Sequence, residues 1–164
     1  MKPTKMLPVM ALIALLTFSC STEELPEDTI NSIELANVPA AKIIEVEILE
    51  LINSHRINIG LNPLSNHNTI KAVAYTHTDY MVEVNNVSHD NFFQRKNSLV
   101  QNASATKVSE NVAYAFSSAE SVVNAWLNSE GHRANIEGDF TDFDVSAEKN
   151  SEGKWYFTNI FIKK

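Results

Sequence analysis

Apolar residues recur at helical spacing in two early segments of the chain. In residues 39–60 one helical face is formed by Ile44, Ile48, Leu51 and His55. From about residue 68 to residue 84 the corresponding face is formed by Ile70, Val73, Ala74, His77, Met81 and Val84. Steps of three and four residues predict two amphipathic helices, and Gly60 suits the position just past the end of the first. The polar, irregular residues 85–107 predict a long loop that holds at most a short helix.

The second half of the chain alternates between apolar and polar positions. Residues 108–116 predict a strand, and Ser117 with Glu120 predicts the capped start of a short helix that ends at Gly131. Residues 143–148 alternate in the manner of a strand with one wet face. Residues 155–162 are apolar on both faces, which predicts a central strand covered by helices. This order of elements predicts an α/β fold, a three-layer α-β-α sandwich around a small, mainly antiparallel sheet.

The N-terminal residues predict export from the cytoplasm. Lys2 and Lys5 precede the apolar run Met6–Phe18, which is too short to cross a bilayer comfortably, so we interpret residues 1–19 as a signal peptide. The only cysteine, Cys20, follows in a sequence that resembles a bacterial lipobox, and its lipidation would anchor the protein to the outer membrane. The alternative is ordinary cleavage near Ser19, which would leave a free thiol.

An acidic segment separates this cysteine from the folded part. Residues 21–37 contain five acidic and no basic residues, so we interpret residues 20–37 as a solvated tether and residues 38–164 as the domain. The acidic run also resembles a surface-export signal, so the domain faces either the periplasm or the cell surface. The formal net charge is −7 without a basic patch, and nucleic acid is not a predicted partner.

Three polar residues stand out as candidates for chemistry. His89 lies inside the irregular loop, and Glu110 shares a strand face with Val108 and Val112, where a carboxylate needs a partner. His132 follows the predicted helix stop, where the negative end of that helix would favour its charged form.

Several motifs resemble the CAP superfamily (SCP/TAPS, pathogenesis-related-1 type), in its short bacterial secreted branch. They are "INSHRINIGLNPL", "AYTHTDYM", "SHDNFFQR", "SENVAY", "AWLNSEGHRANI" and "KWYFTNIFI", in the family's order from about residue 45 to residue 162. The resemblance implies an α-β-α sandwich with a cleft that holds two histidines and two acids. His89, Glu110 and His132 match both histidines and the first acid.

The second acid of that pattern is missing. Its place is Ser129, with Glu130 beside it, and Asn111 adjoins Glu110 in the same cleft. His89, Glu110 and His132 suit Zn²⁺ or another divalent cation, and some family members bind metal. The alternative is a buried His–Glu–His cluster that holds loop, strand and helix end together.

The predicted function is that of a binding module anchored in the cell envelope. The incomplete acid set leaves no residue assigned as catalytic, and the ligand would be a lipid, peptide, glycan or partner protein. A metal-dependent, peptidase-like hydrolase and a surface adhesin remain the alternatives. Outside the cleft, we expect His77 to be a core histidine and Arg56 to hold carbonyls or a carboxylate at a helix end.

Overall fold

The computed structural model describes residues 39–164, which form five helices and four strands. In chain order they are α1 (Ile43–Asn58), β1 (Ser65–Asn66), α2 (Asn68–Glu83), α3 (Phe92–Ala103), β2 (Lys107–Tyr114), α4 (Ala119–Leu127), α5 (Glu130–Ile136), β3 (Asp142–Lys149) and β4 (Trp155–Lys163). The predicted signal peptide, Cys20 and the tether lie outside the described residues. Within residues 39–164, no helix is both long enough and apolar enough to cross a membrane.

The sheet has the strand order β1-β3-β4-β2. Strand β4 pairs antiparallel with both β2 and β3, whereas the short β1 pairs parallel with β3. The prediction that residues 155–162 form a central strand is confirmed, because β4 lies inside the sheet and is buried along nearly all its length. Strand β1, only two residues long, was too short to be predicted from periodicity.

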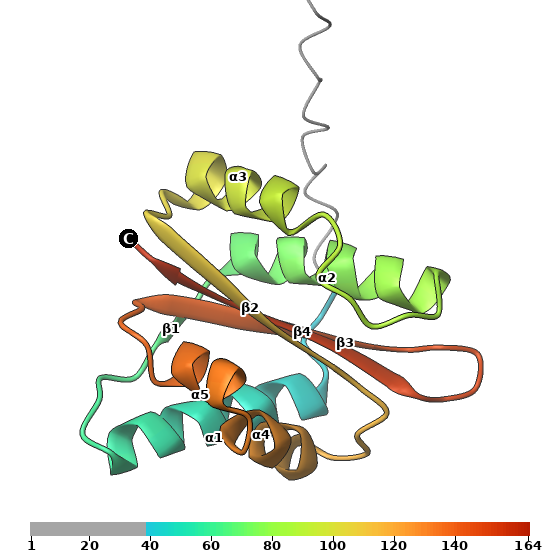
Figure 1. Ribbon diagram of the computed structural model, residues 1–164, viewed down its shortest axis with the longest axis horizontal. Coiled ribbons are helices and arrows are strands. Elements are labelled where there is room, and N and C mark those ends of the chain that lie inside the picture. The colour runs from blue at the N-terminus through green and yellow to red at the C-terminus, as the bar shows by residue number, and fades with distance from the viewer. Residues whose placement is uncertain (1–38) are drawn as a thin grey trace, which may run out of the picture.

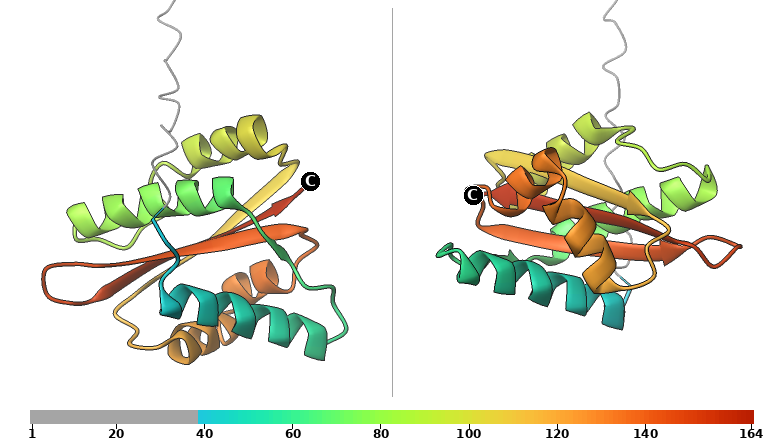
Figure 2. Two further views of the ribbon diagram at one scale, coloured as in Figure 1. Left: turned by 180° about the vertical axis from the view of Figure 1, so that it is seen from behind. Right: turned by 60° about the horizontal axis from the view of Figure 1, so that its bottom comes forward.

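Helices cover both faces of this sheet (Figure 1). Helices α2 and α3 lie on one face, and α1, α4 and α5 lie on the other, as the two further views also show (Figure 2). Among the described residues, two hydrophobic clusters fill the spaces between the layers. The predicted three-layer fold is confirmed, and within residues 39–164 each face of the sheet has its own hydrophobic cluster, as in an independently folding domain.

The prediction that one face of β3 is exposed to solvent is wrong. Asp142, Asp144 and Ser146 are all buried, as are the apolar residues that alternate with them. Alternation correctly predicted a strand, but both faces of β3 are covered by the helical layers, so its polar positions are enclosed as well.

The segment expected to be a long loop contains the twelve-residue helix α3. Its buried residues Arg95, Leu99 and Ala103 follow steps of four, so the helical face exists but begins with a charged side chain. Asn91 and Ser104, both in the left-handed region, flank the helix. The prediction failed because an arginine was not counted as a buried position.

The prediction that Gly131 ends a helix is also wrong. Helix α4 is capped by Ser118 with Ser121, one residue later than expected, and it ends at Leu127. Gly131 instead lies in the first turn of a separate helix, α5, and His132 follows it within that helix.

Candidate functional site

The candidate site is built on β2, an edge strand of the sheet. Val108 packs in the cluster beneath α2 and α3, whereas Ala113 belongs to the cluster on the opposite face. Side chains alternate along a strand, so Glu110 faces α2 and α3 while its neighbour Asn111 faces α4 and α5. Strand β2 therefore presents one candidate residue to each helical layer.

Glu110 is held by an arginine that the sequence analysis did not single out. The Nε of Arg95 donates to Oε2 of Glu110 at 2.7 Å, and a terminal nitrogen of Arg95 donates to Oε1 at 2.7 Å. Arg95 is only 3% exposed, and its other terminal nitrogen donates to the carbonyl of Asp90 at 2.6 Å. This two-point pairing matches the planar guanidinium to the carboxylate and neutralises Glu110 inside the fold.

His89 completes the shell around the same carboxylate. Its Nδ1 lies 2.8 Å from Oε1 of Glu110, which accepts the Nδ1 proton. The His89 side chain is nonetheless 52% exposed, whereas that of Glu110 is 1% exposed. The carboxylate thus fixes the ring orientation and tautomer, so that Nε2 of His89 is left for an external partner.

His77 supports this arrangement from α2. It is buried, as expected for a core histidine, and its Nε2 lies 2.8 Å from the carbonyl of Ser88, which immediately precedes His89. The same Nε2 is 3.9 Å from Oε1 of Glu110. His77 therefore belongs to the cluster, where it positions the backbone that carries His89.

The charges in the cluster depend on one another. Burial alone would raise the pKa of Glu110, but hydrogen bonds from His89 and Arg95, together with the charge of Arg95, outweigh burial and lower this pKa below its usual value. Burial lowers the pKa of His77, and the Arg95 guanidinium lowers it further. The cluster is consequently an ionised Glu110–Arg95 pair beside a neutral His77.

Asn111 connects β2 to α5, which carries His132. The amide nitrogen of Asn111 donates to the carbonyl of His132 at 3.0 Å, and its Oδ1 accepts from the amide of Asn135 at 2.8 Å. These bonds hold the first turn of α5 against the edge strand, and Asn111 itself is fully buried on the face of β2 opposite Glu110. His132 itself is half-buried.

The electrostatic prediction for His132 is wrong. The pKa of His132 is lowered, first by burial and then by the charge of His89. His132 lies in the N-terminal turn of α5, so no negative helix end stabilises its proton there. The charge of His89 thus acts on His132, although none of the hydrogen bonds within residues 39–164 joins the two rings.

The two residues at the position of the missing acid do not complete the cluster. Ser129 precedes α5 without a side-chain capping bond, and Glu130 is exposed in the first turn. Within residues 39–164, Glu130 forms no ion pair. The carboxylate chemistry of the site therefore depends on Glu110.

The three predicted metal ligands do not fit a zinc site in this arrangement. Both oxygens of Glu110 are paired with Arg95, and a guanidinium beside the carboxylate opposes a second cation. Across the described part of the chain, no group of three His, Cys, Asp or Glu side chains is placed to hold a metal ion. A metal site at this place would therefore have to use the imidazoles of His89 and His132 without Glu110, and zinc binding by this pair stays a prediction.

Residues 49–161 match the family described as the CAP, or cysteine-rich secretory protein, family. The chain belongs to the CAP family. It is 33% identical over 124 residues to the uncharacterized membrane protein YlbC of Bacillus subtilis, a match that covers 73% of this chain and 34% of YlbC. It is 34% identical over 98 residues to the uncharacterized protein YkwD of the same organism, covering 56% of this chain and 37% of YkwD. The chain thus spans about a third of the length of these relatives.

Solved structures share this CAP fold. An extracellular protein from Bacillus anthracis that contains an SCP domain superposes with a TM-score of 0.63 at 28% identity, over 73% of this chain and 40% of that protein. An outer surface protein from Borrelia burgdorferi gives a TM-score of 0.65 at 24% identity, over 71% of this chain and 90% of the Borrelia protein. The fold and family expected from the sequence motifs are confirmed.

Proposed function

We propose that this protein is an extracytoplasmic CAP-domain binding module, anchored through Cys20, that recognises its ligand with the imidazoles of His89 and His132. The observation that carries the proposal is the geometry of His89. Its Nδ1 is fixed by a buried carboxylate while half of its side chain is exposed. An oriented imidazole at an open surface is suited to hydrogen bonding with a ligand.

The state of Glu110 favours binding over hydrolysis. A general base must be free to accept a proton from the reacting group, and its pKa should lie near the working pH. Glu110 has both oxygens engaged and a pKa below the ordinary value for a carboxyl group. Glu110 supports His89 and would have to leave Arg95 to serve as a base in the hydrolase alternative.

The extracytoplasmic location rests on sequence and on relatives. Residues 1–19 have the pattern of a signal peptide and Cys20 follows a sequence that resembles a lipobox. The matching Bacillus anthracis protein is extracellular, and YlbC is described as a membrane protein. Display on the cell surface and display in the periplasm are both compatible with this placement.

Sedimentation with defined envelope materials tests the proposal. The fragment 39–164 is incubated with peptidoglycan sacculi, lipopolysaccharide, or vesicles of phosphatidylethanolamine and phosphatidylglycerol. We expect at least one material to retain the fragment and the His89→Ala/His132→Ala variant to lose that retention. His55→Ala is the control, because His55 pairs with Glu137 away from the cluster. Equal retention of the double variant, or no retention of the wild type by any material, would contradict the proposal.

Metal binding has its own test. The fragment is purified without chelator or affinity metal and analysed for zinc, together with the His89→Ala/His132→Ala variant. Stoichiometric zinc that is lost in the variant would show that the imidazoles bind metal despite Arg95.

A further inference from the structure

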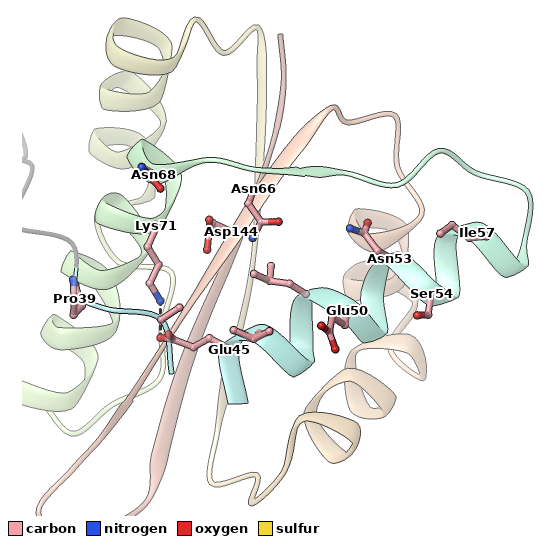
Figure 3. A pocket seen from close by; sticks show the side chains of 13 residues that line it. Pro39, Glu45, Glu50, Asn53, Ser54, Ile57, Asn66, Asn68, Lys71 and Asp144 are labelled. Carbon is pink, nitrogen blue, oxygen red and sulfur yellow. Dashed lines mark ion pairs between the residues drawn. The ribbon is translucent and has the colours of Figure 1, made fainter. Parts of the chain in front are cut away.

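A hollow lies at the opposite edge of the sheet from Glu110. It encloses about 690 Å³ between α1, β1, the start of α2, and β3 (Figure 3). Since the strand order is β1-β3-β4-β2, this hollow and the His89–Glu110 cluster are separated by the width of the sheet. Its volume is within the range of small-molecule sites, and its lining mixes apolar and charged side chains.

The hollow exists because β1 covers only part of the outer edge of β3. Strand β1 pairs with Asp142 and Phe143 alone. Further along β3, the Nζ of Lys71 donates to the carbonyl of Val145 at 2.7 Å, and Oε1 of Glu45 accepts from the amide of Ala147 at 2.8 Å. Side chains thus satisfy the free edge of the strand in place of another strand.

The charges of Glu45 and Lys71 satisfy each other within the fold. Their side chains pair at 2.6 Å, as the dashed contact in Figure 3 shows, and both residues are buried. Glu45 also accepts the backbone amide of Lys42 at 2.7 Å. The Glu45–Lys71 pair therefore adds no net charge to the hollow, and neither residue needs a further counter-ion.

Asp144 is different, because it is a buried carboxylate without a cationic partner. It is 7% exposed, lines the hollow, and accepts hydrogen bonds from the backbone amides of Val145 at 2.9 Å and His67 at 3.2 Å. Among residues 39–164, no Lys, Arg or His forms an ion pair with it. Burial raises its pKa to about 6, although both backbone bonds and the charge of Lys71 oppose the shift. Asp144 therefore keeps a negative charge at neutral pH in a place that disfavours it.

We propose that this hollow binds an organic ammonium ion, with the ammonium group against Asp144 and an apolar chain along α1. Val46, Leu49 and Ile57 supply apolar surface along the lining of the hollow, and Val46 and Ile57 are exposed to solvent. Glu50, exposed on the same lining, adds further negative charge. A cation that replaces water beside Asp144 supplies the missing counter-ion, and this pairing is stronger in a partly enclosed site than in water.

The charge of the hollow argues against its being filled by the chain's own tether. Residues 21–37 precede Pro39, which lines the hollow, but they contain five acids and no base. An anionic segment beside Asp144 and Glu50 would be repelled, so charge complementarity favours an external cation.

A titration of the isotope-labelled fragment 39–164, followed by amide chemical shifts, tests the proposal. The probe is n-hexylammonium, and 1-hexanol and hexanoate provide neutral and anionic chains of the same length. We expect saturable shifts in α1, β3 and the start of α2 with the ammonium alone. Asp144→Asn should weaken this binding about tenfold or more, because a charged hydrogen bond is lost. Glu47→Gln, which removes the same charge from an exposed position on α1 outside the hollow, should bind as the wild type does.

The pH dependence of the wild type gives a second measurement that does not depend on the variant's folding. Hexylammonium stays charged throughout, so its affinity should be constant above about pH 7 and fall by up to tenfold per unit below pH 6, as Asp144 is protonated. The other charged groups that act on Asp144 are Glu45 and Lys71, whereas His67 contacts it through its backbone amide. Glu50 is a further carboxyl group on the lining of the hollow. A flat profile between pH 4.5 and 7 would overturn the proposal.

Three further outcomes would also overturn it. The first is binding of 1-hexanol as tightly as hexylammonium, and the second is equal binding by an Asp144→Asn variant whose amide spectrum shows it to be folded. The third is the absence of saturable binding in a fragment that begins at residue 20 and includes the tether. Binding by both fragments with the expected dependence on charge and pH supports the proposal for the mature protein.

Discussion

Replacement of Arg95 by methionine should be among the most destabilising single changes in this domain. Methionine keeps much of the apolar stem of the arginine but removes both hydrogen bonds to Glu110 and the bond to the carbonyl of Asp90. It leaves a carboxylate whose side chain is 1% exposed, with His89 as its remaining close partner. Removal of one member of a buried pair costs roughly 3–5 kcal/mol, and the bond from His89 places the expected loss near the lower end, about 3 kcal/mol.

The loss should depend on pH in a defined direction. In the wild type the pKa of Glu110 is lowered, so its contribution to stability is present above the ordinary carboxyl pKa and is lost as pH falls through the lowered value. In Arg95→Met the burial of Glu110 is no longer offset by the guanidinium, and its pKa rises instead. The variant can then protonate Glu110 at mildly acidic pH, so the difference in unfolding free energy should be larger at pH 8 than at pH 4.5.

Urea unfolding followed by tryptophan fluorescence measures this difference, since Trp126 is buried in the core. Lys96→Met is the matched control, because it removes the same charge from the next residue of α3 at an exposed position. We expect the control to change stability by about 0.5 kcal/mol or less. The double variant Arg95→Met/Glu110→Gln should recover part of the loss, with a coupling energy of about 1–3 kcal/mol. A loss below 1 kcal/mol for Arg95→Met, or strict additivity in the cycle, would refute this account of the cluster.

Three further predictions concern other parts of the molecule. Asp144→Asn should raise the unfolding free energy by up to about 3 kcal/mol at pH 8, because the ordinary carboxyl pKa of 3.8 is raised to about 6 in the fold; the gain should vanish near pH 4, and a gain in urea unfolding that is constant with pH would contradict the cause. Arg56→Met should cost about 2–4 kcal/mol in the same assay, because this buried guanidinium donates to the carbonyls of Asn62, Ile136 and Gly138 and so ties α1 to the end of α5. Cys20→Ser should move the protein from the membrane fraction to the soluble fraction after cell lysis, and continued membrane association would show that lipidation is not its anchor.

Sequence periodicity predicted the elements whose buried faces are mostly apolar. Helix α2 was placed to within a residue, and β4 was recognised as central because both of its faces are hydrophobic. Helix α3 was expected as no more than a short helix within a loop, because its buried face starts with Arg95. Strand β3 was given a solvent-exposed face because Asp142 and Asp144 were assumed to reach solvent. In both cases the error was the same, since charged side chains were taken as signs of exposure.

The candidate site was predicted only in part, again because a buried charged side chain was not recognised from the sequence. Glu110 was singled out by its apolar neighbours on one strand face, and His89 by its place in an irregular segment. The structure places these two side chains in contact, and their role as a ligand site stays a prediction. Arg95 was not assigned, since nothing local distinguishes a paired, buried arginine from a solvated one. Only the three-dimensional distance between α3 and β2 reveals the partner of the carboxylate.

Three carboxylates of the sheet are buried, and one of them, Asp142, is paired with Lys164. A comparison of the other two, Glu110 and Asp144, shows why Asp144 needs a functional explanation. Glu110 has a guanidinium and an imidazole around it, and its lowered pKa indicates that the folded state favours its charge. Asp144 has backbone donors alone, and its raised pKa means that its charge opposes folding at neutral pH. An asparagine in its place has a single acceptor oxygen, so it would keep one of the two backbone bonds and lose the other, at a cost of about 1 kcal/mol. That loss is smaller than the roughly 3 kcal/mol by which the buried charge destabilises the fold, so stability alone does not account for the aspartate. If Asp144→Asn proves more stable and no longer binds hexylammonium, the result will show that the destabilising charge of Asp144 is needed for ligand binding.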